Sequence, residues 1–423
     1  MSHKPSAPRA RLRVMHVLEA IFGGTATHLC DLVTVTRDVD HIVVVPSQRF
    51  GHRTDDLAVA MLREAGAEVH VIDMRRTPTH PDNLFAFFRL VKLMRKTRPD
   101  IVHGHSSVGG ALARAAALMV PKTPTVWTPN GLLTSSPVLT IERMLSRVTA
   151  ATIAVSESEA ELISRKRLDK CDEVLVIPNG IDLDHVPDPR PMRDILGIPD
   201  HAPVVGTVIR LVPQKAPLDF IDCCQKIHEV RPDTHFVLVG DGPLQDEVDA
   251  RLATWDHGGH FHQVPYLPDV SGLLETCDLF VMLSRYEGAP YAPLEAMRAG
   301  VPVILTNVVG SRDVVEDGAT GVLVAPGDST AAANAAVRLL DSAEDRVLMS
   351  KAAYLRLYRV FDRELQGEAH SELYHRLAGV ERVRTEEPFP ASVDMLVPPR
   401  MRQTAVPAQP ADPQPADAEG VRG

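Results

Sequence analysis

The chain of 423 residues has few cysteines, no long apolar run and no excess of positive charge. Its five cysteines are an odd number and include no Cys-x-x-Cys pair, which favours reduced thiols over a disulfide framework or a structural zinc site. No segment reaches the ~18 apolar residues that a membrane-spanning helix needs, and the basic N-terminus is not followed by the apolar core of a signal peptide. A net charge of -10 argues against a general nucleic-acid binder. We therefore expect a cytoplasmic protein without a nucleic-acid partner, peripheral contact with the inner face of a membrane remaining open.

Short apolar runs alternate with amphipathic stretches along most of the chain, which predicts βαβ units and parallel sheets. The length suits two α/β domains, and 44% hydrophobic with 24% charged residues is ordinary globular composition. In the first half the expected strands are Arg13–Leu18, His41–Val45, Glu68–Ile72, Ile101–Gly104, Thr125–Thr128, Ala151–Val155 and Val174–Ile177. In the second half they are Val204–Ile209, His235–Val239, Phe261–Val264, Leu279–Leu283, Val303–Leu305 and Gly321–Val324.

Composition shifts suggest the domain boundaries. The expected order is a flexible N-terminus (1–12), a Rossmann-like domain (13–186), a linker rich in Pro and Asp (187–203), a second Rossmann-like domain (204–380) and a tail (381–423). The second domain ends in a helical segment, Glu344–Leu377, and the Pro- and Ala-rich tail is expected to be disordered. The carboxyl ends of both parallel sheets should face a central cleft, where such folds bind ligands.

The strongest motif follows the expected strand Leu279–Leu283 and reads SRYEGAPYAPLEAMRAG. Glu287 precedes a tight loop of Gly288, Ala289 and Pro290, and a helix begins near Ala292. Free N–H groups at such a helix start can hold a phosphate or a sugar hydroxyl. Glu287 can accept hydrogen bonds from sugar hydroxyls, and Glu295, behind Leu294 on the helix, can bind a ribose diol. The alternative is a capping Glu287 and a solvated Glu295.

Two cations, Arg210 and Lys215, follow the expected strand Val204–Ile209. At the carboxyl end of a strand they suit a diphosphate, whose charge grows as a nucleotide leaves, so they would stabilise the transition state more than the ground state. An ordinary surface loop is the alternative.

Gly23 and Gly24 come directly after the first expected strand. Two glycines permit close backbone approach, and the helix behind them points its N–H groups at the cleft. The pattern is not Gly-x-Gly-x-x-Gly, so dinucleotide binding is not implied.

Two histidines mark the strand Ile101–Gly104 and its end. His103 is interpreted as a core residue, whereas His105 is placed on the loop that faces the cleft and is kept as a candidate catalytic residue.

The Glu287–Glu295 segment resembles the Glu-x7-Glu signature of retaining glycosyltransferases of family 4, and the resemblance extends from about Val14 to Leu377. It implies the GT-B fold, in which two Rossmann-like domains face each other. It also implies that Glu295 binds the donor ribose and that Glu287 contacts the transferred sugar.

The resemblance assigns further site residues. Arg210 and Lys215 would grip the donor phosphates, although Ile209 stands where the family often has Gly. The loops with Gly240 and with Tyr266 and Leu267 would hold the nucleobase, and the Gly23–Gly24 loop would lie near the donor phosphates and the acceptor.

Asn130 marks a departure from the family pattern. Many relatives carry His before the following Gly, where it contacts the transferred sugar. An amide can hydrogen-bond the same hydroxyl but cannot carry a proton, so an acid–base role at this position is in doubt.

We expect no metal and no cofactor. Asp182 and Asp184 resemble the carboxylate pair of metal-dependent transferases, but their Pro-Asn-Gly setting fits a structural turn of family 4. No cluster of His, Cys or carboxylates shows metal-ligand spacing in the sequence.

The resemblance implies a retaining, metal-independent transfer of a hexose or N-acetylhexosamine from a nucleotide sugar, with UDP-sugars favoured, to a hydroxyl acceptor. The acceptor could be a polysaccharide, a glycolipid or a natural product such as an aminocyclitol. A nucleotide-sugar epimerase of the same fold and a non-catalytic nucleotide-sugar-binding protein stay open. The segment Leu84–Arg98 is interpreted as a Rossmann helix with a solvated basic face, a membrane-surface helix being the alternative.

Overall fold

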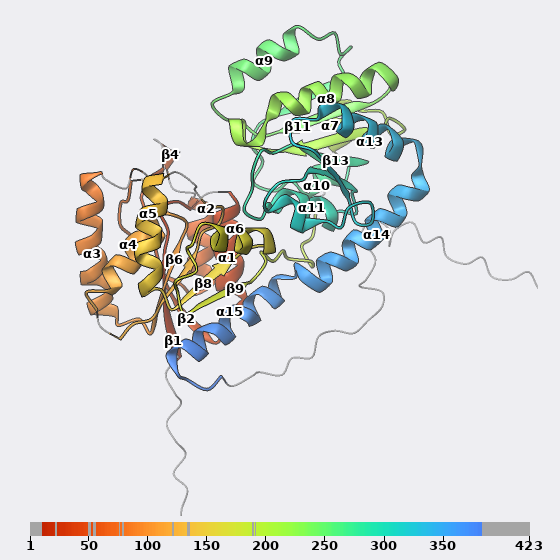
Figure 1. Ribbon diagram of the computed structural model, residues 1–423. Coiled ribbons are helices and arrows are strands. Elements are labelled where there is room, and N and C mark those ends of the chain that lie inside the picture. Colours follow the sequence, from red (N-terminus) through yellow and green to blue (C-terminus); the bar gives the residue numbers. More distant parts are fainter. Residues whose placement is uncertain are drawn as a thin grey trace, which may run out of the picture.

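The computed structural model describes residues 11–21, 23–49, 52–53, 56–75, 77, 80–120, 122–132, 136–187, 190 and 192–382. The expected segments 1–12 and 381–423 therefore lie almost wholly outside the described residues. The chain forms two α/β lobes, each built around one parallel sheet (Figure 1). No helix among the described residues is long and apolar enough to cross a bilayer.

The first sheet has seven strands in the order β5-β2-β1-β6-β7-β8-β9. All pairs are parallel, and the central strands are buried on both faces, which explains their continuous apolar sequences. The strands are β1 (Leu12–Val17), β2 (Val39–Val45), β5 (Glu68–Val71), β6 (Ile101–His105), β7 (Thr125–Thr128), β8 (Ala151–Ala154) and β9 (Glu173–Val176). They confirm the predicted strands closely. A short hairpin of β3 (Gln48–Arg49) and β4 (His52–Arg53) was not predicted.

Helices cover both faces of this sheet. The helices of the first domain are α1 (Gly24–Val35), α2 (Asp56–Glu64), α3 (Pro81–Thr97), α4 (Val108–Ala117), α5 (Ser136–Leu145) and α6 (Glu157–Arg165). α3 and α4 pack on one face and α1 and α2 on the other. α3 starts before its predicted range because Pro81 occupies its first position and the His80 side chain accepts a hydrogen bond from the Asp82 N–H.

The second sheet has six parallel strands in the order β12-β11-β10-β13-β14-β15. These strands are β10 (Val204–Val208), β11 (His235–Val239), β12 (Phe261–Val264), β13 (Leu279–Met282), β14 (Val303–Thr306) and β15 (Val322–Val324), which again confirms the prediction. The associated helices are α7 (Met192–Leu196), α8 (Pro217–Val230), α9 (Gln245–Ala253), α10 (Ser271–Leu274), α11 (Tyr291–Arg298), α12 (Ser311–Val314) and α13 (Ser329–Asp341).

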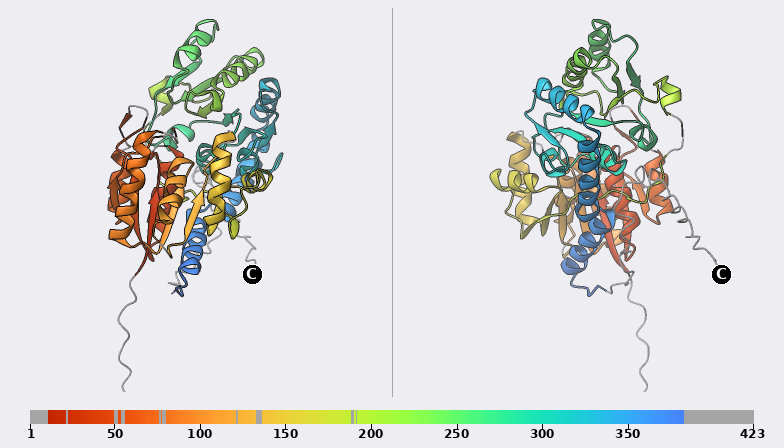
Figure 2. Two further views of the ribbon diagram at one scale, coloured as in Figure 1. Left: turned by 60° about the vertical axis from the view of Figure 1, so that its left-hand side comes forward. Right: turned by 90° about the vertical axis from the view of Figure 1, so that its right-hand side faces the viewer.

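The expected helical segment Glu344–Leu377 is divided into α14 (Ala343–Val360) and α15 (Arg363–Ala378). The break lies at Phe361 and Asp362, where the Ile181 N–H donates to the Phe361 carbonyl (2.7 Å) and the Asp362 side chain caps α15. The helix pair runs from the second lobe to the first (Figure 2). α15 buries Leu373 and Tyr374 against the first sheet, so the last helix of the expected second domain packs on the first.

A layer of buried histidines lies between the first sheet and two helices. His16, His41, His103 and His105 project from one face of the sheet, and His28 of α1 and His370 of α15 cover them. A chain of hydrogen bonds joins His41 to His16 (3.0 Å) and His16 to His105 (3.1 Å). Burial lowers the pKa of all six, to about 4 for His28 and His41 and to about 3 for His370. The layer therefore folds with neutral imidazoles.

We predict that the protein loses stability when the pH falls below about 6.5, the ordinary pKa of His. Below this pH the histidines of the unfolded chain bind protons, whereas the buried imidazoles of the folded protein stay neutral. This difference lowers the free energy of unfolding by about 1.4 kcal/mol per pH unit for each such proton. Thermal unfolding followed at pH 7 and about pH 5 tests this sign. His370→Gln keeps a side-chain donor and removes one titrating group, so its melting temperature should depend less steeply on pH; an equal slope would contradict the assignment.

Candidate functional site

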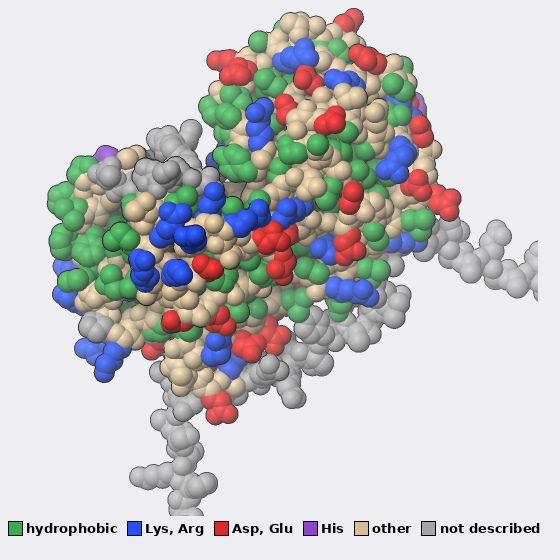
Figure 3. All heavy atoms as spheres, viewed as in Figure 1, with side chains coloured by type: hydrophobic (Ala, Val, Ile, Leu, Met, Phe, Trp, Pro, Cys, Tyr) green, Lys and Arg blue, Asp and Glu red, His purple; other side chains and the backbone are tan. Residues whose placement is uncertain are grey.

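The loops at the carboxyl ends of both sheets meet where the two lobes touch. A Cβ on Gly288, after β13, would lie 2.6 Å from the backbone nitrogen of Gly131, after β7. A Cβ on Gly24, after β1, would lie 3.1 Å from the ring of Tyr291 on α11. The outline of the molecule is notched beside this junction (Figure 3). Sequence positions far apart, around 24, 131 and 288, thus share one site, as expected for facing sheets.

An ion pair joins two of the predicted residues. Lys215 ends the short 3-10 turn after β10 and donates from Nζ to Glu287 Oε1 at 2.6 Å. The Glu287 side chain is 6% exposed and that of Lys215 is 20% exposed. The Glu287 N–H in turn donates to the Val309 carbonyl (3.2 Å), which fixes the loop. Arg210 lies on the same side of the sheet, just after β10, and is exposed. The structure thus brings a cation and a carboxylate to one place, with a second cation nearby along the chain.

α11 positions the second carboxylate of the motif. Pro290 occupies its N-cap position without a side-chain hydrogen bond, Leu294 is buried in the domain core, and Glu295 lies one turn along the helix, half-buried. Burial raises the pKa of Glu295, and the Arg298 guanidinium opposes the shift. Arg298 also donates to the Asp182 carbonyl (3.0 Å), a structural contact for the PNGID turn.

Asn130 carries a buried donor without a partner among the described residues. Its φ of 53° is left-handed, a conformation that Asn tolerates, and its Nδ2 atom makes no hydrogen bond there. The next residue, Gly131, donates its N–H to Glu159 (2.8 Å) and abuts Gly288. A free amide donor at the junction is suited to a ligand oxygen, because leaving it unpaired costs free energy.

The structure differs from the expected position of His105. We expected it on a loop facing the cleft, but it is the last residue of β6 and is fully buried in the histidine layer. A predicted catalytic role would require an exposed edge, and His105 has none. His103 is a core residue, bonded to Tyr374 (2.7 Å) and Thr128 (2.8 Å).

The base-binding candidates follow β11 and β12. Gly240 has a φ of 127°, and a Cβ there would collide with the Ile209 carbonyl, so this turn requires glycine. Tyr266 is 46% exposed and Leu267 packs partly against the domain core. Gly23, with a φ of 57°, caps α1 at the opposite side of the junction.

Sequence reasoning missed the residues that hold the lobes together. Asn179 bridges them, pairing with His28 of α1 (3.0 Å) and donating to the Ala289 carbonyl (3.0 Å). Ser156 donates to the Gly288 carbonyl (3.2 Å), and Ser158 binds the Asp313 carboxylate. Asn179 belongs to the PNG turn already noted in the sequence, whereas the serines gave no signal beyond a helix cap.

Three histidine nitrogens have spacing that a metal could use. One from each of His16, His103 and His105 lies within 4.8 Å of the others. Both ring nitrogens of His16 and of His103 have hydrogen-bond partners, whereas Nδ1 of His105 is buried without one among the described residues. His16 and His105 are 89 positions apart in the sequence, so no local spacing pattern predicts this group.

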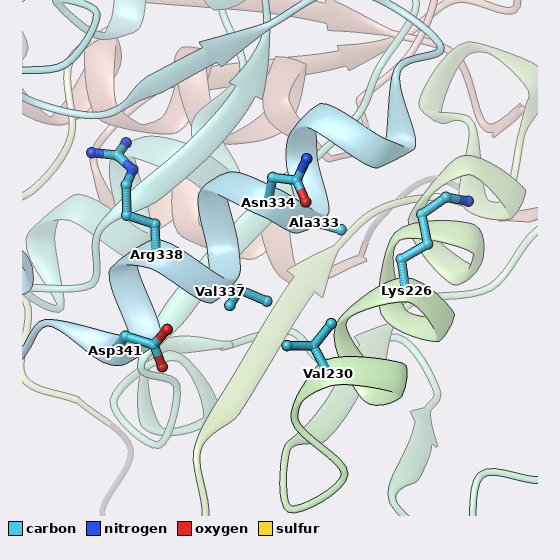
Figure 4. A pocket seen from close by; sticks show the side chains of 7 residues that line it. All are labelled: Lys226, Val230, Ala333, Asn334, Val337, Arg338 and Asp341. Carbon is cyan, nitrogen blue, oxygen red and sulfur yellow. The ribbon is translucent and has the colours of Figure 1, made fainter.

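A groove of about 410 Å³ lies between α8 and α13, away from the junction (Figure 4). Its lining, which includes Lys226, Val230 and Arg338, contains none of the predicted site residues. These positions belong to the carboxyl-terminal halves of both helices, at the end of the sheet opposite the site.

Two family models match the chain, one for each lobe. "Glycosyltransferase Family 4" matches residues 22–185 and "Glycosyl transferases group 1" matches residues 189–356.

Relatives and solved structures agree with these matches. UDP-Gal:alpha-D-GlcNAc-diphosphoundecaprenol alpha-1,3-galactosyltransferase of Escherichia coli is 32% identical over 62% of this chain and 71% of its own. Glycogen synthase of Mycobacterium tuberculosis is 29% identical over 90% of this chain and 97% of its own. The fold is shared with Anabaena Alr3699/HepE in complex with UDP and glucose, at a TM-score of 0.75 and 20% identity, over 86% of this chain and all of that one. The chain belongs to glycosyltransferase family 4, with the GT-B fold, and is a glycosyltransferase that uses a nucleotide-sugar donor.

Proposed function

We propose that this enzyme transfers a hexose or N-acetylhexosamine from a UDP-sugar to a hydroxyl acceptor, with retention of the anomeric configuration and without a metal or cofactor. The observation that carries the proposal is the Lys215–Glu287 pair (2.6 Å) at the junction of the lobes, with Glu295 on the adjoining helix. A UDP donor is supported by the galactosyltransferase relative, whose name specifies UDP-Gal, and by the structural neighbour with bound UDP.

Each group at the junction has a chemical task in this proposal. Lys215 and Arg210 bind the donor diphosphate, and Lys215 exchanges its bond to Glu287 for one to a phosphate oxygen. Glu287 and the Asn130 amide then bind hydroxyls of the transferred sugar, which pairs the Nδ2 atom that is unsatisfied in the structure described here. Glu295 accepts hydrogen bonds from the ribose.

In the reaction the bond between the anomeric carbon and the diphosphate oxygen breaks, and a bond to the acceptor oxygen forms on the same face. The acceptor proton passes to the departing diphosphate. Negative charge accumulates on that diphosphate in the transition state, so fixed cations beside it lower the barrier. The first domain supplies the acceptor side and the second the donor side, and their approach assembles the site.

The alternatives, an epimerase of this fold or a binding protein without catalysis, are separated by product analysis. The protein is incubated with an acceptor panel and with UDP-glucose, UDP-galactose or UDP-N-acetylglucosamine, GDP- and ADP-sugars serving for comparison. Mass spectrometry should then detect UDP and a glycosylated product. An altered sugar without transfer would establish the epimerase, and unchanged donor would leave binding alone.

Glu295→Ala should weaken donor binding about ten- to a hundredfold, because a charged acceptor of ribose hydrogen bonds is lost. Isothermal titration with UDP measures this. Glu247→Ala, an exposed carboxylate on α9, is the matched control. An unchanged affinity for UDP in Glu295→Ala would overturn the ribose assignment.

Lys215→Ala should lower kcat about 10²- to 10³-fold, as the loss of a charge-stabilising donor does in other active sites. Lys226→Ala, in the groove between α8 and α13, should keep full activity. Initial rates of UDP release with a saturating donor distinguish the two variants. Equal losses would show that the Lys215 effect is nonspecific.

Gly288→Ala should reduce the transfer rate at least about tenfold. The new Cβ would lie 2.6 Å from the Gly131 nitrogen and push the lobes apart, and small displacements of reacting groups lower rates strongly. The second domain should remain folded, since Gly288 lies on a surface loop of that domain. Transfer rates together with melting curves measure both effects. Ser156→Ala removes a hydrogen bond to Gly288 without adding volume and should cost much less; full activity of Gly288→Ala would show that close contact of the lobes is unnecessary.

A further inference from the structure

α3 exposes an apolar cluster that the fold does not use. Its buried face, which includes Leu90 and Met94, already packs on the first sheet. The opposite face exposes Leu84 (60%), Phe85 (68%) and Phe88 (61%) in the first half of the helix. Hydrophobic side chains gather over α3 along the left edge of the lower lobe (Figure 3). Adjacent large apolar side chains exposed on one helix face are typical of interaction surfaces.

The same helix face is basic. Four exposed cations follow the apolar cluster toward the carboxyl-terminal end of α3: Arg89, Lys92, Arg95 and Lys96. Residues 81–148 contain nine Lys or Arg and three Asp or Glu, in a chain whose net charge is -10. Two of these groups, Arg114 and Glu142, form a buried pair, which leaves eight basic and two acidic residues outside that pair. Positive charge is therefore concentrated around α3–α5 against the overall balance of the protein.

Further exposed apolar side chains lie at the carboxyl-terminal ends of the next two helices along the chain. Leu118 and Met119 follow α4, and Met144 of α5 is 64% exposed. α3 packs on α4, and the Arg114–Glu142 pair connects α4 to α5. Lys and Arg side chains also gather in the middle of the lower lobe, over α5 and α6 (Figure 3).

The apolar cluster lies at the functional end of the first domain. In a parallel α/β domain the N-terminus of a helix that follows a strand lies at the carboxyl edge of the sheet. Leu84, Phe85 and Phe88 occupy the first half of α3, and the Asn130–Gly131 loop follows β7 at that same edge. A surface bound through the cluster would therefore lie beside the acceptor side of the junction.

We propose that the face of α3 with Leu84, Phe85, Phe88, Arg89, Lys92, Arg95 and Lys96, here named the α3 surface, docks on an anionic phospholipid bilayer. The apolar side chains enter the headgroup–acyl boundary and the cations bind lipid phosphates, as in interfacial amphipathic helices. It follows, if the proposed transfer reaction holds, that the acceptor hydroxyl belongs to a membrane-borne glycolipid rather than to a small soluble molecule.

Vesicle flotation of the full chain tests the proposal. The protein should float with vesicles of phosphatidylcholine mixed with phosphatidylglycerol, float less with phosphatidylcholine alone, and be released by salt. Phe85→Ser with Phe88→Ser should lower partitioning about tenfold for each phenylalanine removed. Lys92→Glu with Lys96→Glu should weaken binding to the anionic vesicles selectively.

Matched controls lie on α14 of the second domain. Val347→Ser with Leu348→Ser removes exposed apolar side chains, and Lys351→Glu reverses an exposed charge. Both should float like the unmodified protein. Equal flotation of the α3 and α14 variants, or no preference for anionic vesicles, would overturn the proposal. Loss of a dimer in Phe85→Ser with Phe88→Ser, without vesicle binding, would identify the face as a contact between copies and also overturn it.

Isothermal titration with UDP on the same variants separates this proposal from the reaction itself. UDP binding without flotation would contradict only the proposed membrane contact. Flotation without binding of any nucleotide would contradict the proposed donor but would leave the membrane proposal for the α3 surface supported.

Discussion

The close approach of two glycine backbones, Gly131 and Gly288, is the constraint on which the site depends. A Cβ on Gly288 would lie 2.6 Å from the Gly131 nitrogen, so this approach requires glycine at position 288, whereas position 131 favours glycine because of its φ of 100°. This contact places the Asn130 amide, from the first domain, beside the loop that carries Glu287 in the second. A site divided between two domains needs such a short link, because small displacements of reacting groups have large effects on rate.

Polar contacts around Gly131 and Gly288 hold the two loops in this position. Glu159 binds the Gly131 N–H, Ser156 binds the Gly288 carbonyl, and Asn179 binds the Ala289 carbonyl. On the other side of Asn179 lie His28 and, through it, Gln366 of α15. The helix that returns from the second domain thus contacts the same network as the loop of Gly288 and Ala289. The neutral histidine layer beneath it lets α15 pack tightly, since charged imidazoles there would repel one another without solvent.

The fold could be predicted largely from the sequence because buried parallel strands have a local signature of short apolar runs. The sequence also predicts that Glu287 and Glu295 lie close together, since they share one strand–loop–helix unit; their assignment to the donor stays a prediction. The contacts between domains could not, because no local pattern couples Asn179 to Ala289 or Ser158 to Asp313. His105 was misplaced for a related reason: β6 extends one residue further than its apolar run, and the partners that bury its polar end come from distant segments. The break between α14 and α15 likewise depends on Ile181, which no helical period reveals.

The two lobes differ in what their surfaces contribute. Most of the predicted donor residues lie within the second domain, on loops that follow its own strands, so nucleotide binding can be encoded by one compact unit. The first domain contributes fewer of the predicted residues at the junction: among the described residues these include the Asn130 amide and the Gly23–Gly24 turn, which offer little discrimination by themselves. We infer that acceptor selection also draws on features outside the junction. The α3 surface, with exposed Phe85 and Phe88 and its four cations, offers such a feature. A membrane bound there, as proposed above, would restrict which hydroxyls reach the proposed donor site without requiring a specific pocket for each.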